Sequence, residues 1–393
     1  MTFEQARECV IGKVAALRAP PGIEEVPLDE AAGRVLAEPV LADRDFPALS
    51  RSLRDGFALR AADTPARLRV AGEVRAGQVF EAEIAPGEAV EIMTGAPVPA
   101  GADAVVMVEH ARSEGAYVLA PAAEPGQHVS PRASEARAGD ELVPRGRRLG
   151  FAEIAALASA GRVSVPVFNQ PRVALLPTGD EVVEVAAHPQ AHQVRNSNAH
   201  SLAVQVRQAG GLPVLLPIAR DTHDATRAAI ERGLEADLLL LSGGVSAGKY
   251  DIVEEVLASL GAEFYFDRVL IQPGQPLVFG RATGKFFFGL PGNPASTSVT
   301  FQLFARAALE LLGGQDETAL LLPLARLTAD FRHKTGLTRF LPARLSANGA
   351  EVAPVPWRGS SDIPALARAN AFLVADAARE SWKAGDLIRV LPR

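Results

Sequence analysis

The sequence is almost devoid of cysteine. Cys9 is the only one among 393 residues, which excludes an intrachain disulfide and a cysteine-based zinc site. It lies within a helical pattern of apolar residues, where we expect a buried structural thiol. Aromatic residues are also scarce, at 6%, whereas the chain has 34 glycines and 29 prolines. This composition indicates many turns and excludes a small disulfide scaffold.

Long apolar runs and an excess of basic charge are missing as well. No apolar run approaches the roughly 18 residues that span a bilayer, and residues 1–10 carry two acids and lack the apolar core of a signal peptide. We therefore expect a cytoplasmic protein without membrane association. The formal net charge is −6, so we expect no nucleic-acid partner, although a local basic patch is not excluded.

The first 170 residues combine helical and β-prone segments. A capping-box pair, Thr2 and Gln5, precedes apolar residues at helical spacing, which predicts a helix that Pro20 ends. From about residue 40 to 140, short β-prone runs alternate with glycine and proline, as is typical of an all-β unit. Residues 151–160 are predicted to form another helix.

Residues 171–314 alternate between strand and helix patterns. Strands are predicted at 173–176, 213–218, 237–241 and 286–289, and helices at 201–209, 222–234, 252–260 and 295–312. Such alternation of apolar strands and helices predicts a parallel sheet covered on both faces. Ligands of these sheets bind beyond the carboxyl ends of the strands. The candidate loops therefore follow Leu176, Ile218, Leu241 and Leu290.

A glycine-rich loop, residues 242–251, follows the third of these strands. Its glycines allow close approach of a ligand to the backbone, and its N–H groups precede a helix, which favours an anion. A phosphate cradle and a plain strand-to-helix turn both remain open from this loop alone. The spacing nearly matches a P-loop, but Tyr250 stands where that motif needs serine or threonine.

Carboxylates follow the neighbouring strands. Glu181 and Asp221 come after the first two predicted strands, and Asp251 closes the glycine-rich loop. Three acids at one sheet edge would suit Mg²⁺ beside a phosphate. Asp221 alone could equally cap the helix that starts at Thr222. We expect the three together to form a site.

The loop after the last strand, residues 289–296, contains two prolines. Pro294 suits the start of a helix, and Ser296 offers a hydroxyl near the positive end of that helix. This loop is tighter than a structural turn requires, which favours a function. We expect the histidines to be solvated loop residues rather than zinc ligands. Trp357 and Trp382, in the β-prone segment after residue 319, are predicted to pack in a core or at a strand edge.

These motifs together give the chain a resemblance to the MoeA-type molybdopterin molybdenumtransferases, in order along nearly its whole length. The motifs that carry it are Asp55-Gly56-Phe57-Ala58, Met93-Thr94-Gly95-Ala96-Pro97-Val98-Pro99, Thr178-Gly179-Asp180-Glu181, Ser242-Gly243-Gly244-Val245-Ser246 and Gly289-Leu290-Pro291-Gly292-Asn293-Pro294. The family inserts molybdate into adenylylated molybdopterin. The resemblance implies that activity, with a MogA-type adenylyltransferase as partner.

The resemblance also implies an elongated homodimer with a multidomain α/β plus β fold. The expected domains are an elongated linker and dimerisation domain (1–40 plus 141–170), an inserted β domain (41–140), a MogA/MoaB-like α/β domain (171–318) and a C-terminal β-barrel (319–393). The inserted domain of one subunit is expected to reach over the α/β domain of the other.

Carried over residue by residue, the resemblance implies catalytic roles for Asp55, Glu181, Asp221 and Asp251, the last three also holding Mg²⁺. The implied substrate-binding residues are Thr94, Thr178, Gly179, Asp180, Ser242, Gly243, Gly244, Ser246, Gly248, Gln272, Pro273, Gln275, Pro291, Gly292, Asn293, Pro294 and Ser296.

The chain departs from the family pattern in two places. The family usually has a Lys-Pro-Gly-Lys-Pro loop, where this chain has glutamine at 272 and 275. It also has Arg51 and Arg54 in the run before Gly56, where the family usually has no arginine. We hypothesise that these arginines replace the lost charge across a dimer cleft. The alternatives are a paralogue that binds a pterin or nucleotide without metal transfer and, more distantly, a nucleotide-dependent kinase.

Overall fold

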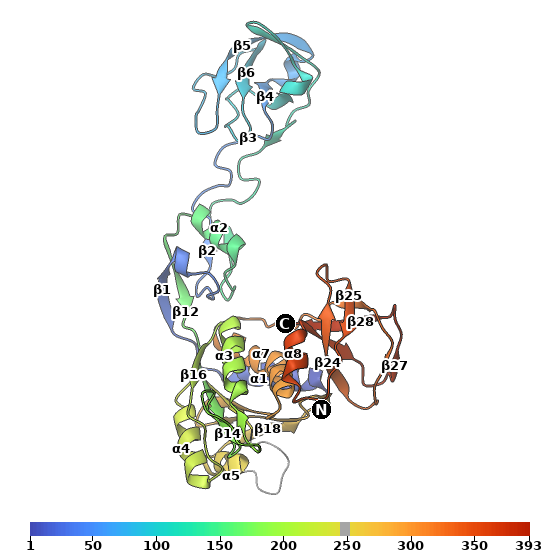
Figure 1. Ribbon diagram of the computed structural model, residues 1–393. Coiled ribbons are helices and arrows are strands. Elements are labelled where there is room, and N and C mark those ends of the chain that lie inside the picture. The colour runs from blue at the N-terminus through green and yellow to red at the C-terminus, as the bar shows by residue number, and fades with distance from the viewer. Residues whose placement is uncertain (244–251) are drawn as a thin grey trace.

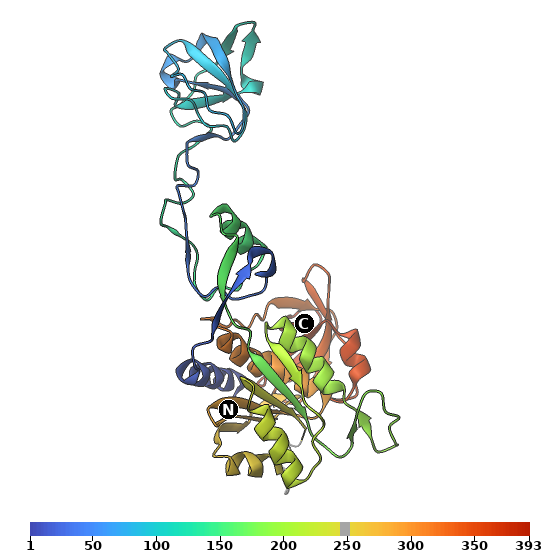
Figure 2. The ribbon, with the colours of Figure 1, turned by 90° about the vertical axis from the view of Figure 1, so that its left-hand side faces the viewer.

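The computed structural model describes residues 1–243 and 252–393. The predictions for Gly244, Ser246, Gly248 and Asp251 therefore lie outside the described residues. The molecule is elongated (Figures 1 and 2). A β unit stands at one end, joined by two extended segments to a linker unit, and the linker unit leads to an α/β unit with a C-terminal β unit beside it.

The α/β unit is built on a mixed sheet with strand order β16-β13-β17-β21-β20-β18. The first four strands run parallel, as predicted, and β20 and β18 extend the sheet as antiparallel strands. The strands are β13 (Arg172–Pro177), β16 (Leu212–Leu215), β17 (Leu238–Ser242), β18 (Glu263–Arg268), β20 (Pro276–Ala282) and β21 (Lys285–Leu290). The antiparallel pair escaped prediction because its register depends on neighbouring strands.

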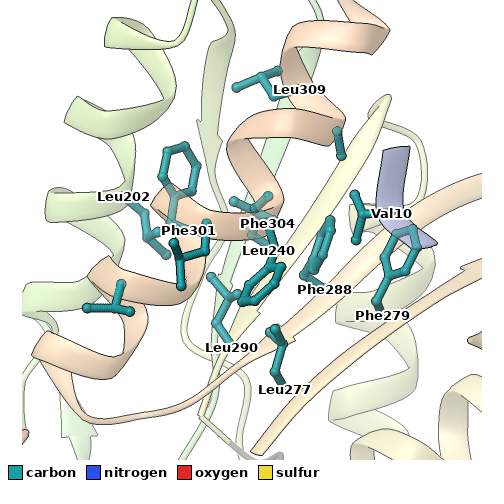
Figure 3. Close-up of a cluster of buried hydrophobic side chains, with 14 of the residues drawn as sticks. Val10, Leu202, Leu240, Leu277, Phe279, Phe288, Leu290, Phe301, Phe304 and Leu309 are labelled. Carbon is teal, nitrogen blue, oxygen red and sulfur yellow. The ribbon is translucent and has the colours of Figure 1, made fainter. Parts of the chain in front are cut away.

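Helices cover both faces of this sheet. α4 (His223–Gly233) and α5 (Ile252–Ser259) pack on one face, and α3 (Ser197–Gln208) and the segment from α6 to α7 on the other. Figure 3 shows the second face, where Phe288 and Leu240 of the sheet meet Phe301 and Phe304. The helix predicted at 295–312 consists of α6 (Pro294–Thr300), a π-helical turn η4 (Phe301–Ala305) and α7 (Arg306–Leu312).

The first helix, α1 (Phe3–Leu17), has the predicted capping box, in which Gln5 N donates to Thr2 Oγ1 and Thr2 N donates to Gln5 Oε1. The sequence places residues 1–40 together in the linker domain. In the structure, however, α1 packs in the α/β core, where Val10 lies beside Phe279 (Figure 3). α1 thus belongs to the α/β unit and the residues from β1 onward belong to the linker unit, because the chain leaves the α/β unit only after α1.

The linker unit is formed by chain segments from both sides of the insertion. β1 (Ile23–Pro27) pairs with β12 (Ser164–Phe168), and β2 (Val40–Leu41) with β11 (Glu141–Val143), both antiparallel. The 3₁₀ turn η1 (Leu28–Glu30) and α2 (Phe151–Ser159) complete it. α2 begins at the predicted residue, and the positive φ of Gly161 follows its end.

The inserted unit is all-β, as predicted. Its sheet has the order β7-β4-β6-β5-β9-β8, and a short β3–β10 pair lies beside it. The elements are β3 (Arg51–Ser52), β4 (Gly56–Leu59), η2 (Ala61–Asp63), β5 (Ala66–Val74), β6 (Glu88–Ile92), β7 (Ala104–Met107), η3 (Val108–His110), β8 (Arg112–Glu114), β9 (Tyr117–Ala120) and β10 (Val129–Ser130). Apolar side chains on both faces form two small clusters.

The C-terminal unit is a closed barrel, as predicted, because β24 pairs with both β25 and β26. A short strand from the α/β unit, β19 (Ile271–Gln272), pairs with β24 and joins the two units. The elements are β22 (Leu324–Leu327), β23 (Phe331–Arg332), β24 (Thr338–Leu345), β25 (Glu351–Pro354), α8 (Ile363–Arg368), β26 (Ala371–Ala375), β27 (Ser381–Trp382) and β28 (Leu387–Pro392). Within residues 1–243 and 252–393, every helix is too short or too polar to cross a bilayer.

A buried histidine in the barrel gives the fold a pH-dependent contact. Trp382 Nε1 donates to Nε2 of His333 at 3.3 Å, and Nδ1 of His333 lies 3.1 Å from the carbonyl oxygen of Lys334. An accepting Nε2 requires the neutral ring. Burial lowers the pKa of His333 below its ordinary value of 6.5.

We therefore expect acid to destabilise the barrel through His333. The folded-state pKa lies below the unfolded one, so the stabilising contribution is complete above pH 6.5 and is lost as the pH falls toward the folded-state pKa. The measurement is the melting temperature between pH 7.5 and 5 for the protein and for His333→Gln, which does not titrate. An equal acid-induced decrease in both proteins would contradict this assignment.

Candidate functional site

The loops predicted to carry function meet at one edge of the α/β sheet, because hydrogen bonds continue between the chains just beyond the strands. Thr178 N donates to Ser242 O, Gly179 N to Ala219 O, and Gly243 N to Leu290 O, each at 3.2 Å. These bonds tie the ends of β13, β16, β17 and β21 together. The predicted convergence of these loops is therefore present.

The Thr178–Glu181 loop turns sharply at Gly179, which has a φ of +129°. A Cβ on this glycine would lie 2.5 Å from Oε2 of Glu181, so the carboxylate of Glu181 lies against the backbone at position 179. The positive φ favours glycine at this position. The loop therefore holds Glu181 at the end of β13, where its side chain is exposed.

Asp221 reaches this loop rather than capping a helix. Its Oδ2 accepts from Asp180 N at 3.3 Å, and Asp180 Oδ1 accepts from Asp221 N at 3.4 Å. Arg220 lies 3.7 Å from Asp180. The N-cap of α4 is Thr222, without a side-chain capping bond. The capping alternative for Asp221 is therefore not observed, and the acid instead locks two loops of the sheet edge together.

The described residues do not complete the predicted magnesium site. No group of three His, Cys, Asp or Glu side chains suited to a metal ion occurs in residues 1–243 and 252–393. Glu181 and Asp221 supply carboxylates at the edge, and the third predicted ligand, Asp251, lies outside this range. Mg²⁺ usually takes one or two protein carboxylates plus waters and substrate phosphates. Two carboxylates are compatible with this coordination, and the magnesium site stays a prediction.

Gly243 and Thr178 form a tight backbone contact at the end of β17. Gly243 has a φ of +100°, and a Cβ there would lie 2.7 Å from the carbonyl oxygen of Thr178. Thr178 is 2% exposed, and its Oγ1 has no hydrogen-bond partner within the described part of the chain. A buried hydroxyl without a partner is costly, so this edge has a polar group whose hydrogen bond is not made within the described part of the chain.

The loop after β21 is fixed by side-chain hydrogen bonds. Thr297 Oγ1 donates to Pro291 O at 2.5 Å, and Asn198 Nδ2 donates to Gly292 O at 2.7 Å. Pro294 occupies the first turn of α6, as predicted. Ser296 follows on the same helix and is buried. This loop is therefore a rigid support between the sheet and α6.

The loop with the two glutamines lies between units. Gln272 ends β19, which pairs with the barrel strand β24, and Pro276 begins β20 of the α/β sheet. Gln272–Pro273 is a cis peptide. Gly274 has a φ of +104°, and a Cβ there would lie 2.6 Å from Cγ2 of Thr300. The loop is therefore packed closely on α6.

These loops and the barrel enclose a cavity of about 510 Å³, which we name the sheet-edge cavity. Predicted residues that line it are Glu181, Gly243, Gln272, Pro273, Gln275, Pro291, Gly292, Asn293 and Ser296. Other predicted residues lie at the same edge outside the lining, namely Thr178, Gly179, Asp180, Asp221, Ser242 and Pro294. The cavity is within the usual size range of small-molecule sites.

The barrel supplies a wall that the sequence did not reveal. Leu337, Trp357, Gly359 and Ser360 line the cavity, and Ser360 O accepts from Ala295 N of α6 at 3.0 Å. The prediction of core or edge packing holds for Trp382, which is buried, but is wrong for Trp357. The only sequence signal was a tryptophan in a loop with proline and glycine, and nothing local indicates which distant loop it meets.

The cavity has little charge. Among its described lining residues none is lysine, arginine or histidine, and Glu181 is the only ionisable side chain. Gln272 and Gln275 offer amide donors without charge. An oxyanion bound here thus finds hydrogen bonds but no cation from the described residues of the same chain.

Asp55 and Thr94 meet each other but not the sheet-edge cavity. The backbone N–H and the hydroxyl of Thr94 both donate to Oδ1 of Asp55, at 2.6 and 2.7 Å. Both bonds lower the pKa of Asp55, and the bond from the backbone N–H has the larger effect. Both residues belong to the inserted unit, which stands apart from the α/β unit in two views (Figures 1 and 2). Within one chain they therefore do not join Glu181.

Arg51 and Arg54 are exposed in the segment that leads to Asp55. Among the residues that the structure describes, neither guanidinium lies within 4 Å of a carboxylate. Ser52 Oγ donates to Arg54 O at 2.5 Å and fixes the turn between them. The inserted unit thus presents an ionised carboxylate and two cations without counterions on one short loop.

Comparison with known proteins matches three family descriptions along the chain. They are "MoeA N-terminal region (domain I and II)" at residues 1–161, "Probable molybdopterin binding domain" at 174–311 and "MoeA C-terminal region (domain IV)" at 324–392. The molybdopterin molybdenumtransferase of Bacillus subtilis is 34% identical over 383 residues, covering 94% of this chain and 89% of that protein. The protein of the same name from Nostoc is 38% identical over 317 residues, covering 78% and 73%.

Solved structures agree over the whole chain. A crystal structure of a molybdopterin biosynthesis MoeA protein from Pyrococcus horikoshii matches with a TM-score of 0.75 and 32% identity, covering 100% of this chain and 98% of that one. A second structure from the same organism gives 0.81 and 25%, with complete coverage of both chains. The similarity thus extends to the arrangement of all the units.

We expect Gly274→Ala to be more destabilising than Gly336→Ala. Both glycines have positive φ, +104° and +98°, but a Cβ at 274 would clash with Thr300, whereas at 336 nothing lies within 4 Å. The conformational cost of a side chain at positive φ is therefore similar in both variants. The difference between their losses of stability measures how closely the loop at 272–276 is packed. Overpacking costs about 1–3 kcal/mol, measured as the difference in thermal stability by calorimetry. Equal losses would show that the loop is loosely packed.

Proposed function

Because this chain belongs to the MoeA family of molybdopterin molybdenumtransferases, we propose that its sheet-edge cavity inserts molybdate into adenylylated molybdopterin, with release of AMP, in molybdenum cofactor biosynthesis. The observation that carries the proposal is that the loops after β13, β17 and β21, the loop at 272–276 and the barrel wall all line a single cavity. The family and its role in cofactor biosynthesis rest on the comparisons. The reaction itself, its metal requirement and its assembly are our proposal.

In this proposal the phosphate of the adenylate lies against the end of β17. The backbone at Gly243 can approach a ligand closely, since it carries no side chain, and the hydroxyl of Thr178 has no hydrogen-bond partner among the described residues. Exposed backbone beyond parallel strands is a usual place for phosphate groups. The pterin part then extends toward Trp357, and the amides of Gln272 and Gln275 hydrogen-bond the oxo groups of the metal substrate.

Two carboxylates serve different ends in this proposal. Glu181, exposed at the cavity wall, takes a proton from the attacking oxygen as the adenylate is cleaved. Asp221 holds the Thr178–Glu181 loop in place through Asp180. Mg²⁺, when held by Asp221 together with substrate phosphates and water, would neutralise phosphate charge.

A second copy of the chain completes the site. The inserted unit carries Asp55, Thr94, Arg51 and Arg54 far from its own cavity (Figure 1), and the cavity lacks a described cation. We propose a homodimer in which the inserted unit of one subunit covers the cavity of the other. The arginines then supply the charge that glutamines 272 and 275 do not. The adenylylated substrate comes from a MogA-type partner, in the cytoplasm.

A second function is favoured by one observation. A cavity without described cationic lining also suits a protein that binds the pterin or its nucleotide but does not transfer the metal. Such a protein would bind adenylylated molybdopterin and release no AMP on addition of molybdate. The reconstituted reaction therefore separates the two functions.

We expect purified protein, mixed with adenylylated molybdopterin, Mg²⁺ and molybdate, to release AMP. Glu181→Gln and Asp55→Asn should each lower the rate by about 100-fold or more, the usual contribution of a positioned acid–base group. Glu184→Gln, an exposed acid outside the cavity lining, is the matched control. AMP release by chromatography is the readout.

Binding of the intermediate without AMP release would overturn the transfer function and leave the binding function. Asp55→Asn with unchanged activity would instead remove the inserted unit from the site. Mixing Glu181→Gln with Asp55→Asn adds a test of the dimer, since a shared site regains part of the activity in mixed dimers.

We expect Arg51→Ala plus Arg54→Ala to weaken binding of tungstate, a molybdate analogue, by about tenfold or more, because charge-assisted hydrogen bonds are roughly twice as strong as neutral ones. Adding Gln272→Lys and Gln275→Lys should restore it. Arg112→Ala, an exposed arginine elsewhere on the inserted unit, should bind normally. Calorimetric titration provides the measurement, and unaltered affinity in the double variant would refute the charge replacement.

A further inference from the structure

A second, larger cavity lies where three units meet, away from the sheet-edge cavity. It has a volume of about 760 Å³. Its walls come from the linker segment 144–148, from α1 and α7 of the α/β unit with the segment 315–321 that follows them, and from residues 391–393 of the C-terminal unit. None of its lining residues takes part in the proposed reaction, and we name it the arginine-lined cavity.

Its lining is basic in a chain that is acidic as a whole. The net charge of the chain is −6. The arginines of this lining are Arg7, Arg145, Arg147, Arg148, Arg306 and Arg393, whereas its acids are Glu310, Asp316 and Glu317. The local basic patch that composition left open is therefore present, and it lies inside a cavity rather than on a flat surface.

Some of these arginines have carboxylate partners. Arg306 pairs with Glu310 at 2.7 Å, and Arg145 lies 3.4 Å from Asp316. Arg147 pairs with Glu153 of α2 at 2.9 Å. These pairs fix the side chains and neutralise part of the charge.

The other three arginines have only neutral partners. Arg148 donates to Gln208 O at 2.9 Å, Arg7 to Leu303 O at 2.7 Å, and Arg393 to the carbonyls of Leu366 and Ala369. Within the described part of the chain, no carboxylate lies within 4 Å of these three guanidinium groups. These three positive charges thus line one cavity without an ion pair among the described residues, although Glu310 lies near enough to Arg7 to act on its pKa.

Burial makes the positive charge of Arg7 costly. Arg7 is 9% exposed, and burial lowers the pKa of its guanidinium, with Glu310 acting in the opposite direction. Arg148 is half-buried and Arg393 is exposed, although partial desolvation lowers the pKa of Arg393. Charges that are withdrawn from water and left unpaired are unfavourable. An anion in the cavity would compensate them, because the guanidinium fork binds phosphate and carboxylate oxygens in pairs.

The remaining wall is apolar, formed by Ala319, Leu320, Leu321 and Leu391. The volume of the cavity falls within the range of small-molecule sites and is much larger than the volume of one inorganic ion. We propose that this cavity binds a phosphorylated small molecule of nucleotide size, with its phosphates on Arg7, Arg148 and Arg393 and its organic part on the apolar wall. The site is separate from the proposed reaction and does not depend on it.

The position of the cavity gives its ligand a structural consequence. Arg148 belongs to the segment between β11 and α2 of the linker unit, and Arg7 and Arg393 belong to the two units below it. A phosphate held by all three would join the linker unit to the α/β unit and the C-terminal unit.

The test is calorimetric titration of the full chain with pyrophosphate and with ADP at low and high salt. We expect saturable binding that weakens with salt, ADP tighter than pyrophosphate, and a loss of about tenfold or more in Arg148→Gln, typical of a charge-assisted contact. Arg147→Gln, whose partner is Glu153, should lose less. Arg162→Gln, an exposed arginine of the linker unit outside the cavity, is the matched control, and circular dichroism checks folding.

Two further arms separate this site from the sheet-edge cavity and from other anions. Arg148→Gln should leave AMP release in the reconstituted reaction unchanged, so failure here is distinct from failure of the proposed reaction. Citrate should bind more weakly than pyrophosphate. The proposal is overturned if neither phosphate compound binds at millimolar concentration, if Arg148→Gln and Arg162→Gln bind alike, or if citrate or an acidic peptide binds more tightly than ADP.

Discussion

The parallel register of β13, β17 and β21 is the constraint on which the rest of the structure depends. Val173 pairs with Leu238, and Leu238 with Phe286, so the three strands end level with one another. The hydrogen bonds just beyond the strands then continue the ladder into the loops. A shift of one residue would turn the buried side chains to the opposite face. It would also separate Thr178 from Gly243, whose close contact forms the edge.

Much of this edge follows from the sequence, because the signals are local. An uninterrupted run of leucines at 238–241 predicts a buried parallel strand, and the loops after such strands share an edge whatever the details. The same reasoning places Glu181 and Asp221 near each other. It fails for Trp357 and for the β19 pairing, since both depend on contacts between units distant in sequence. It also misplaces α1, whose apolar stripe does not indicate which core receives it.

The inserted unit shows how a site can be divided within one chain. Thr94 lowers the pKa of Asp55, and the two arginines beside it have no ion-pair partner among the described residues, yet no described residue of the α/β unit contacts this loop. The sheet-edge cavity shows the opposite composition, with amides and a carboxylate but no described cation. Each surface supplies what the other lacks, which is electrostatic complementarity of the kind that sets orientation between partners.

The shared loop at residues 271–276 has a thermodynamic consequence. Its first two residues pair with the barrel strand β24, and its last residue pairs with β18 of the α/β sheet, so the two glutamines lie in the connection between the two units. Occupancy of the cavity and docking of the barrel are then linked equilibria. If a ligand stabilises the contact between the barrel and the α/β unit, that contact raises the affinity for the ligand by the same free energy. Substitutions deep in the barrel, distant from any substrate, would therefore change the affinity of the cavity for its ligand.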